Sequence, residues 1–439
     1  MPLNALSGSP SNAPLGDAPA NPDNPPADLE VWRRRASTLD AADPLAPERD
    51  RFLLDAAPGV SAYLDGNSLG RPLATTADRL SEFVQQQWGA RLIQGWTDSW
   101  MGWPEEVGDA IGRVALGAGP GQTVVGDSTT VLFYKLVRAA VDAMAATGRD
   151  EVVCDTDNFP TDRFVLQGIA AERGLTLRWI ETDPNAGITL EQVRATVGPR
   201  TALATFSHVA YRSGHLADAA GITRVVHDAG GLVLWDLSHS VGSVELALDE
   251  WGVDLAVGCT YKYLNGGPGA PAFAYLAHVH HGRLAQPIHG WMGHAEPFAM
   301  GPRYVPDAGV RQLVSGTPPI VAMVPVRTGL EQLERVGIAA VRAKSVQLTG
   351  FALELADAWL APYGVEIVSP RDPDQRGGHL TLRRSDFRAV NDRLWETGVL
   401  PDFRAPDGIR LGLAPLSTSF SEVLEGIEAL ARMVAENPS

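Results

Sequence analysis

Short apolar runs alternate with amphipathic stretches through the middle of this chain. Stretches between the runs, such as residues 162–174, have the apolar spacing of surface helices. Alternation of this kind predicts an α/β fold with a mainly parallel central sheet and helices on both faces. The runs that we interpret as buried strands are EVVCDT (151–156), LRWIET (177–182), TALATFSHV (201–209), GLVLWDLSH (231–239) and VDLAVGCT (253–260).

The pattern changes after about residue 322. A long helical stretch, 324–360, is followed by three shorter apolar segments, GVEIVSP, GGHLTLRR and GIRLGLAP, with helices between them. This order predicts a smaller α+β domain over residues 323–439, beside a large domain over 76–322. The first 26 residues are rich in Pro, Asn, Ala and Gly, which predicts a disordered tail.

Lys262 lies between an apolar strand and a glycine-rich turn, in VGCTYKYLNGGPGAP (257–271). An amine that is held partly desolvated at a strand end has a lowered pKa and can bond to the aldehyde of a cofactor. Taken alone, a lysine beside glycines is more often a solvated turn residue. Lys262 is therefore a candidate nucleophile, and the neighbouring sequence has to distinguish this role from that of a solvated turn residue.

Asp236 provides part of that context, because it ends the apolar run LVLW (232–235). Ligands of open α/β sheets collect at the carboxyl ends of strands. A carboxylate there can pair with the protonated pyridine nitrogen of pyridoxal 5'-phosphate and keep the ring an electron sink. The alternative is that Asp236 caps the next helix and His239 is a polar residue of its first turn. Together, Asp236 and Lys262 favour the cofactor.

Two other segments supply what such a site needs. The helical segment 126–148 opens with Ser128, Thr129 and Thr130, so its first turn offers amides, hydroxyls and a positive dipole end to an anion. Serine and threonine also begin most helices simply as N-caps. The segment DNFPTDRF (157–164) follows an apolar run and can place Phe159 against a flat ring with Asp162 nearby, although Phe159 also fits a core position.

Composition limits the classes of function. The 439 residues are enough for two domains or one elaborated domain. A formal net charge of −16 argues against nucleic acid or an anionic membrane as partner, and against a DNA-binding regulator. Two cysteines, Cys154 and Cys259, exclude a disulfide framework and lack the spacing of a metal site. With no long apolar run and no signal sequence, we expect a cytoplasmic protein.

Seven segments of the chain together resemble the kynureninase family. They occur in order, and the resemblance covers roughly residues 28–435. Members of this family are pyridoxal phosphate hydrolases of the fold-type I aminotransferase superfamily. The lysine segment alone indicates only the superfamily, whereas GWMGH, SGTPPI and the DFR segment are more specific. The resemblance implies the fold-type I transferase fold, with residues 27–75 returning to the small domain. The segments are YLDGNSLG (63–70), NFPTD (158–162), WDLSHSVG (235–242), VGCTYKYLNGGPGAP (257–271), GWMGH (290–294), SGTPPI (315–320) and PDFRAPDGIRLGLAPL (401–416).

The resemblance also implies roles for single residues at the cofactor. Lys262 matches the Schiff-base lysine, Asp236 the partner of the pyridine nitrogen, and Phe159 the stacking ring. Tyr261 matches a tyrosine that touches the phosphate and transfers protons. The other implied cofactor residues are Ser128 and Thr129 at the phosphate, Asp162 and His239 beside the ring, and Trp291 and Thr317 from the neighbouring subunit.

At the substrate, Arg404 matches the arginine that grips the α-carboxylate, a task for a planar fork. Asn67, Trp96 and Gly316 with Thr317 are the other implied substrate contacts; some family members have asparagine where this chain has Thr317. Because Trp96 and Gly316 offer no polar partner for a 3-hydroxyl, we expect 3-hydroxykynurenine to be a poorer substrate than kynurenine.

The implied reaction is hydrolytic Cβ–Cγ cleavage of L-kynurenine to anthranilate and L-alanine, a step of tryptophan catabolism, in a homodimer with shared active sites. Two other fold-type I activities are the alternatives. A cysteine desulfurase needs a nucleophilic cysteine on a flexible loop, and neither Cys154 nor Cys259 fits. An aminotransferase remains open on sequence alone.

Overall fold

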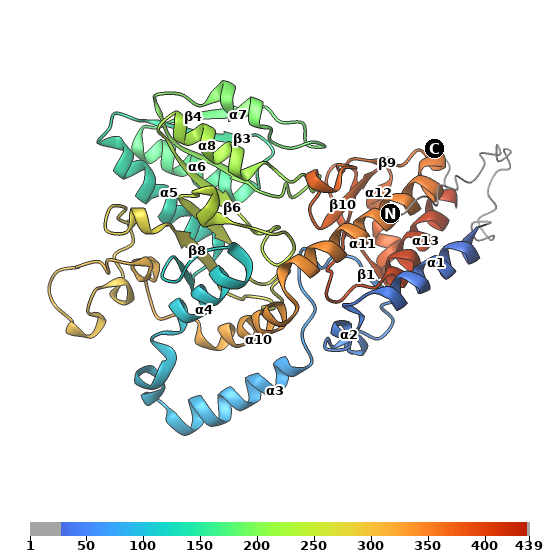
Figure 1. Cartoon of the computed structure of the whole chain (residues 1–439), viewed down its shortest axis with the longest axis horizontal. Helices are drawn as coiled ribbons and strands as arrows, with labels where there is room; N and C mark the ends of the chain where they lie inside the picture. The colour runs from blue at the N-terminus through green and yellow to red at the C-terminus, as the bar shows by residue number, and fades with distance from the viewer. Residues whose placement is uncertain (1–27, 437–439) are drawn as a thin grey trace, which may run out of the picture.

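The computed structural model describes residues 28–436 and shows two layered regions joined by long helices (Figure 1). The tail predicted for residues 1–26 lies outside the described residues. A large sheet with its helices occupies one side of the view, and the amino- and carboxyl-terminal helices lie together on the other side.

The large region is built on a seven-stranded sheet in the order β2-β8-β7-β6-β5-β3-β4. Strands β3 to β7 pair in parallel, which confirms the predicted mainly parallel sheet. The strands are β2 (Thr123–Gly126), β3 (Glu151–Asp155), β4 (Thr176–Ile180), β5 (Thr201–Ser207), β6 (Leu232–Asp236), β7 (Leu255–Gly258) and β8 (Ala272–Leu276).

Strand β8 was not predicted from the sequence. It runs antiparallel between β2 and β7. The chain passes from β7 to β8 through residues 259–271, a glycine-rich loop without a helix, whereas a parallel connection needs a crossover that is usually helical. The loop that carries Lys262 is therefore the direct link between two neighbouring strands.

Side chains on the two faces of this sheet enter two different cores. Neighbouring residues alternate between them: Val152, Leu203 and Leu234 lie in one core with α5, whereas Val153, Ala204 and Trp235 lie in the other with α8 and α10. The sheet is thus buried on both faces, which explains its near-continuous apolar runs. The helices of this region are α4 (Trp103–Ile111), α5 (Thr129–Ala145), α6 (Pro160–Arg173), α7 (Leu190–Thr196), α8 (Ala219–Asp228), α9 (Leu248–Trp251) and α10 (Ile320–Val336).

The small region has an antiparallel sheet in the order β12-β13-β10-β9 and a separate parallel pair, β1 with β11. Its core contains Leu29 of α1 and Ala62 of β1 together with carboxyl-terminal residues, so the amino-terminal segment is part of this region. Its elements are α1 (Leu29–Ala42), β1 (Ala62–Tyr63), α11 (Ile338–Trp359), β9 (Glu366–Ile367), β10 (His379–Arg383), α12 (Phe387–Glu396), β11 (Val399–Leu400), β12 (Asp402–Arg404), β13 (Gly408–Gly412) and α13 (Phe420–Glu436).

The stretch 324–360, expected as one helical segment, consists of two helices separated at Gly337, which has a φ of 83°. Val341 still lies in a core of the large sheet, and Leu348 lies in the core of the small region. Core packing therefore changes within α11, later than the sequence boundary at residue 323. Outside both sheets lie α2 (Ala46–Arg49), α3 (Thr75–Glu82) and the π-helical turns Phe83–Gly89, Trp96–Trp100 and Gly112–Leu116.

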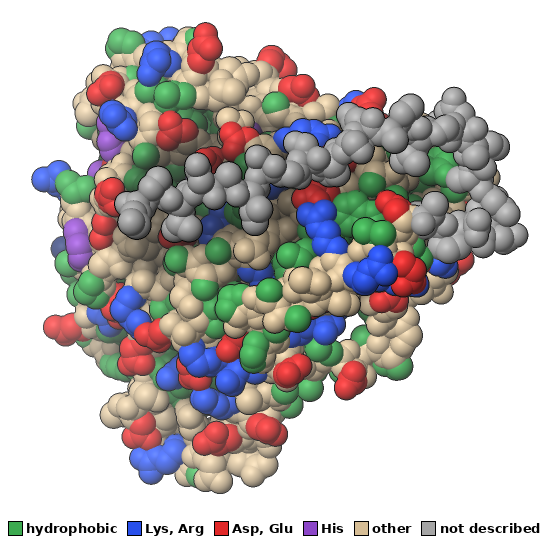
Figure 2. Space-filling view, turned by 45° about the vertical axis from the view of Figure 1, so that its right-hand side comes forward, with side chains coloured by type: hydrophobic (Ala, Val, Ile, Leu, Met, Phe, Trp, Pro, Cys, Tyr) green, Lys and Arg blue, Asp and Glu red, His purple; other side chains and the backbone are tan. Residues whose placement is uncertain are grey.

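Acidic and basic side chains are interspersed on the face drawn in Figure 2, where they form no continuous stripe of one sign. Within residues 28–436, no helix has the length and apolar character needed to cross a membrane.

Candidate active site

A cavity of about 240 Å³ lies at the carboxyl ends of the central strands. This is the edge at which open α/β sheets bind ligands. The cavity brings together residues from four separate segments of the sequence. Those predicted from the sequence are Ser128, Thr129, Phe159, Asp162, Asp236, His239, Tyr261 and Lys262, together with Thr130 of the expected anion-binding turn; those not predicted are Thr161, Ser238, Cys259, Ala270 and Ala272.

Asp236 and Lys262 come together because β6 and β7 are parallel neighbours, with Asp236 paired in register with Val257. Both strands therefore release the chain at the same edge. Asp236 is 6% exposed, and one carboxylate oxygen accepts a hydrogen bond from the backbone N–H of Ser238 over 2.8 Å. Asp236 also lines the cavity.

The amine of Lys262 is buried and lies 3.2 Å from Nε2 of His239. Burial lowers the pKa of Lys262 below its ordinary value, although Cys259 and Asp236 act in the opposite direction. Burial also lowers the pKa of His239 well below its ordinary value, and the nearby Lys262 adds to this. His239 is therefore neutral, and Lys262 has a larger neutral fraction than an exposed lysine.

Lys262 differs from the other lysines of the chain, Lys135 and Lys344. Each of those two is buried in an ion pair 2.6 Å long, with Asp127 and Asp43 respectively. Within the described residues Lys262 forms no ion pair and faces the cavity. It is thus the lysine whose amine is available for chemistry.

The amino end of α5 forms one wall of the cavity. Ser128 is its N-cap and accepts from the backbone N–H of Val131 over 3.4 Å, as the capping alternative expected. Capping and ligand binding are compatible here, because the amides and the positive end of the helix dipole still point at the cavity.

Phe159 and Asp162 reach the cavity from the start of α6. Phe159 is 36% exposed, with its edge against Tyr211 at 5.4 Å between ring centroids, so it is not a core residue. Asp162 is 2% exposed, and its Oδ2 makes no hydrogen bond within the described structure. Burial raises the pKa of Asp162 well above its ordinary value, and Asp236 contributes further. A buried polar atom without a partner indicates that a ligand completes this wall.

Tyr261 stays protonated at neutral pH, because burial raises the pKa of its hydroxyl above the ordinary value. Its backbone oxygen accepts a hydrogen bond from Gly70 over 2.9 Å. A Cβ at residue 70 would lie 2.3 Å from the backbone oxygen of Lys262, so only glycine allows this approach. The segment 63–70 of the small region is in this way fixed against the lysine loop.

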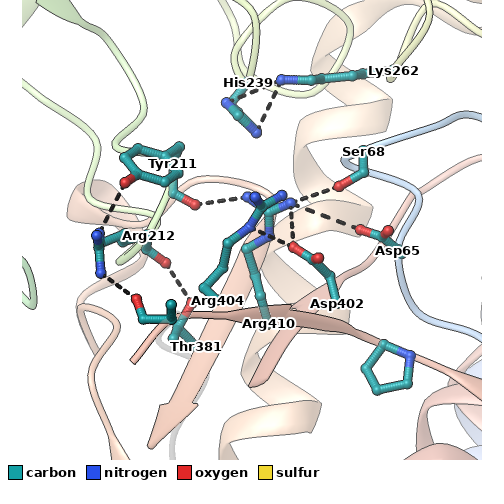
Figure 3. Close-up of polar contacts among 12 residues, drawn as sticks. Asp65, Ser68, Tyr211, Arg212, His239, Lys262, Thr381, Asp402, Arg404 and Arg410 are labelled. Carbon is teal, nitrogen blue, oxygen red and sulfur yellow. Dashed lines mark hydrogen bonds and ion pairs between the residues drawn. The ribbon is translucent and has the colours of Figure 1, made fainter. Parts of the chain in front are cut away.

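Next to the cavity, Arg410 is buried among partners from three parts of the chain (Figure 3). It donates to the backbone oxygen of Tyr211 over 2.8 Å and to Oγ of Ser68 over 2.6 Å. With the Asn67 amide oriented to satisfy its neighbours, Nε of Arg410 also donates to its oxygen over 3.0 Å. Burial lowers the pKa of Arg410 to about 10, with Arg404 contributing, and Arg410 in turn helps to lower the pKa of Lys262.

Arg404 lies further out. Its side chain is 33% exposed, pairs with Asp402 over 2.6 Å and lines a separate cavity of about 290 Å³ with Arg212 and Arg383. The sequence analysis assigned the substrate carboxylate to Arg404 and did not name Arg410, which is six residues further on in the same segment and is buried beside Asn67. The signal was present, because GIRLG places a lone arginine within an apolar strand.

Four other predicted residues do not line the cavity. Trp291 is 40% exposed and contacts Phe298, and Gly316 and Thr317 are also exposed. Trp291 and Thr317 were expected to reach the cofactor of the neighbouring subunit, and Gly316 was expected to contact the substrate. Trp96 is partly buried, packs against the core and lies at a steep angle to the ring of Trp100, with 5.6 Å between ring centroids.

The cavity fits pyridoxal phosphate in the chemistry of its donors. It combines a helix amino end for a phosphate, a carboxylate for a ring nitrogen, an exposed aromatic face and a buried amine with a lowered pKa. The unpaired Oδ2 of Asp162 is the observation that calls for a ligand. Within residues 28–436, no group of three or more side chains is arranged to hold a metal ion.

Comparisons with known proteins agree with this site. A family model described as the kynureninase C-terminal domain matches residues 341–430. The chain is 36% identical over 408 residues to a kynureninase of Pseudomonas fluorescens, covering 92% of this chain and 95% of that protein. It is 38% identical over 403 residues to a kynureninase of Burkholderia pseudomallei, covering 91% and 94%.

Solved structures share the fold at lower identity. A C-DES mutant with glycine covalently linked to its pyridoxal phosphate cofactor superposes with a TM-score of 0.74 at 18% identity, covering 87% of this chain and 98% of that one. The cysteine desulfurase CsdA of Escherichia coli gives 0.74 at 15% identity, covering 90% and 99%. At such identities the likeness concerns the fold, whereas the relatives at 36–38% identity also determine the family. The chain belongs to the kynureninase family of pyridoxal phosphate-dependent hydrolases.

Proposed function

We propose that this chain hydrolyses L-kynurenine to anthranilate and L-alanine, with water supplying the hydroxyl that completes the anthranilate carboxyl group. The observation that supports this proposal most is that Lys262 and Asp236 line one cavity, and that the pKa of Lys262 is lowered there. The similarity of the chain to kynureninases supports the choice of substrate.

The chain's own residues would hold the cofactor as follows. The amides of α5 with Ser128 and Thr129 bind the phosphate, Asp236 keeps the ring nitrogen protonated, and Phe159 covers one face of the ring. When bound, pyridoxal phosphate supplies an electron sink for negative charge at the substrate's α-carbon.

Lys262 moves the proton at that α-carbon. Burial disfavours the ammonium form, so a larger fraction of the amine is neutral and able to accept a proton near neutral pH. The neutral imidazole of His239, 3.2 Å away, can accept a hydrogen bond from the protonated amine. Tyr261 remains a phenol in the same pH range, so it donates rather than accepts protons.

The substrate carboxylate is assigned here to Arg410, in preference to Arg404. Arg410 is buried beside Asn67, and its charge depresses the pKa of both Lys262 and His239 more than the charge of Arg404 does. Arg404 opens instead toward the separate cavity. A rigid guanidinium fork close to the amine would orient the α-carbon toward Lys262.

The purified protein with pyridoxal phosphate should convert L-kynurenine to anthranilate, followed by anthranilate fluorescence, with L-alanine formed in equal amount. The finer expectation is that kcat/KM for 3-hydroxykynurenine is lower by about 10-fold. Pyruvate-dependent transamination, or sulfide release from L-cysteine, without anthranilate formation would contradict the proposal and favour one of the two other fold-type I activities.

We also propose a homodimer in which each subunit completes the other's site. Support comes from Trp291 and Phe298, which contact each other and remain 40% and 63% exposed, and from the exposed Gly316 and Thr317. A large aromatic pair facing solvent is typical of an interface.

Mixing Lys262→Ala with Trp291→Ala after partial unfolding should restore activity, because a hybrid dimer contains one site free of both changes. Each variant refolded alone is the control. A fully active monomer, or no recovery in hybrids that are shown to form, would contradict shared sites.

A further inference from the structure

Asp402, Arg404 and Arg410 are brought together by strand register. Residues 402 and 404 lie on one face of β12, and Asp402 is directly opposite Arg410 on the antiparallel strand β13. Arg404 is opposite Gly408, which has no side chain to separate it from its neighbours. One carboxylate therefore contacts two guanidinium groups, which lie close together (Figure 3).

The distances show that Asp402 is shared. Its Oδ2 lies 2.6 Å from Nε of Arg404 and 2.8 Å from Nη2 of Arg410. Oδ2 of Asp402 and Nε of Arg404 are nevertheless buried without an aligned hydrogen bond in the described structure. Charge attraction thus holds these contacts without the directional part of a good hydrogen bond.

The donors of Arg410 can be counted. A guanidinium has five N–H groups, and Tyr211, Ser68 and Asn67 accept from Nη1, Nη2 and Nε respectively. One N–H on each terminal nitrogen remains, which is the pair that a carboxylate takes in two-point contact. Two carboxylates lie beside Nη2, Asp402 at 2.8 Å and Asp65 at 3.8 Å, so Asp402 is the nearer competitor for this nitrogen.

We propose that Asp402 competes with the substrate carboxylate for Arg410, and that Arg404 is a positioning residue which keeps Asp402 when the substrate displaces it. The inference rests on the proposed function, in which Arg410 binds the carboxylate. The neutral partners Tyr211 and Ser68 have no second cation, whereas Asp402 has Arg404 at 2.6 Å. Asp402 is accordingly the partner that leaves Arg410 at least cost, since its charge stays paired.

The test measures binding of L-alanine and of L-alaninamide to the holoenzyme by absorbance titration. The two probes differ in the carboxylate, so the ratio of their Kd values isolates Arg410. Asp402→Asn removes the competing charge and should lower the Kd of L-alanine by about 3- to 10-fold relative to L-alaninamide. Arg404→Gln leaves Asp402 paired with Arg410 alone. This variant should raise the Kd of L-alanine relative to L-alaninamide by a similar factor.

The double variant distinguishes competition between Asp402 and the bound carboxylate from a purely structural role of Asp402 and Arg404. With Asp402→Asn present, Arg404→Gln should no longer weaken L-alanine binding, because Arg404 has no carboxylate left to retain. Arg383→Gln is the matched control: it removes another guanidinium of the same outer cavity, paired with Glu366 instead, and should change neither Kd.

If Asp402 only supported the structure of the site, its replacement would weaken the binding of L-alanine. A higher Kd for L-alanine in Asp402→Asn therefore overturns the proposal. An unchanged ratio in Arg404→Gln overturns it independently, even if Asp402→Asn fails to fold. Hydrolysis of L-kynurenine by the unmodified enzyme is measured in parallel. Absence of hydrolysis would count against the proposed function. Normal hydrolysis together with a higher Kd for L-alanine in Asp402→Asn would count against this inference alone.

Discussion

Lys262→Ala is expected to reduce the rate of L-kynurenine hydrolysis by at least about 10⁴-fold, the largest effect of any single substitution in this chain. The variant loses both the amine that bonds the cofactor and the group that moves the α-proton. The side chain is buried at the cavity wall without an ion pair, so its removal should leave the fold intact. Arg113→Ala, which removes an exposed cation, is the control for activity.

The same prediction has a chemical readout that does not depend on turnover. Borohydride reduction of the holoenzyme should fix the cofactor to one lysine, and peptide mapping has three positions to distinguish. The ion pairs of Lys135 and Lys344 keep their amines away from the cavity. An adduct on either of those residues, or more than about 1% of normal activity in Lys262→Ala, would refute the assignment.

Asp236→Asn is expected to lower kcat by well over about 10²-fold. The carboxylate is buried at the end of β6, where a charge-assisted hydrogen bond to the ring nitrogen is worth several kcal/mol, and each 1.4 kcal/mol is tenfold in rate. Asparagine keeps the size of the side chain and its bond from Ser238 but removes the charge. Rates at saturating substrate and cofactor, with an absorbance spectrum, separate lost catalysis from lost binding.

Asp228→Asn, at the exposed end of α8 in the same region, serves as the matched control and should be neutral. Near-normal activity of Asp236→Asn would rule out the role of ring-nitrogen partner. A variant that lost its cofactor, yet regained full kcat at high cofactor concentration, would instead limit Asp236 to binding.

Strands β3, β5, β6 and β7 could be predicted because they are buried on both faces and so appear as apolar runs, whereas the edge strand β4 is partly exposed and was recognised from its β-favouring residues. Asp236 and Lys262 were recognised for the same reason, since polar residues directly after such runs stand out. Strand β8 is equally apolar, but its neighbours in the sheet depend on the path of the lysine loop, which no local pattern specifies. Gly337, which separates α10 from α11, was likewise hidden within a continuous helical pattern.

The arginine site shows where sequence reasoning reached its limit. Arg404 and Arg410 occur in one segment, and both have the residue type that a carboxylate needs. Strand register places both on one face of the small sheet, but Arg404 lines the outer cavity whereas Arg410 is buried beside Asn67, which comes from a segment far away in sequence. This difference in burial depends on tertiary packing, which the sequence of the segment does not specify.

The scarcity and burial of lysine have a practical consequence. The three lysines are 0%, 8% and 3% exposed, and the basic surface of the described residues consists of arginine. Reagents that acylate amines, and cross-linkers or resins that couple through them, therefore find no lysine on the folded surface. Attachment to a support or a label cannot rely on surface lysines, and among the lysines only Lys262, which lines the cavity, can be reached by a reagent small enough to enter it.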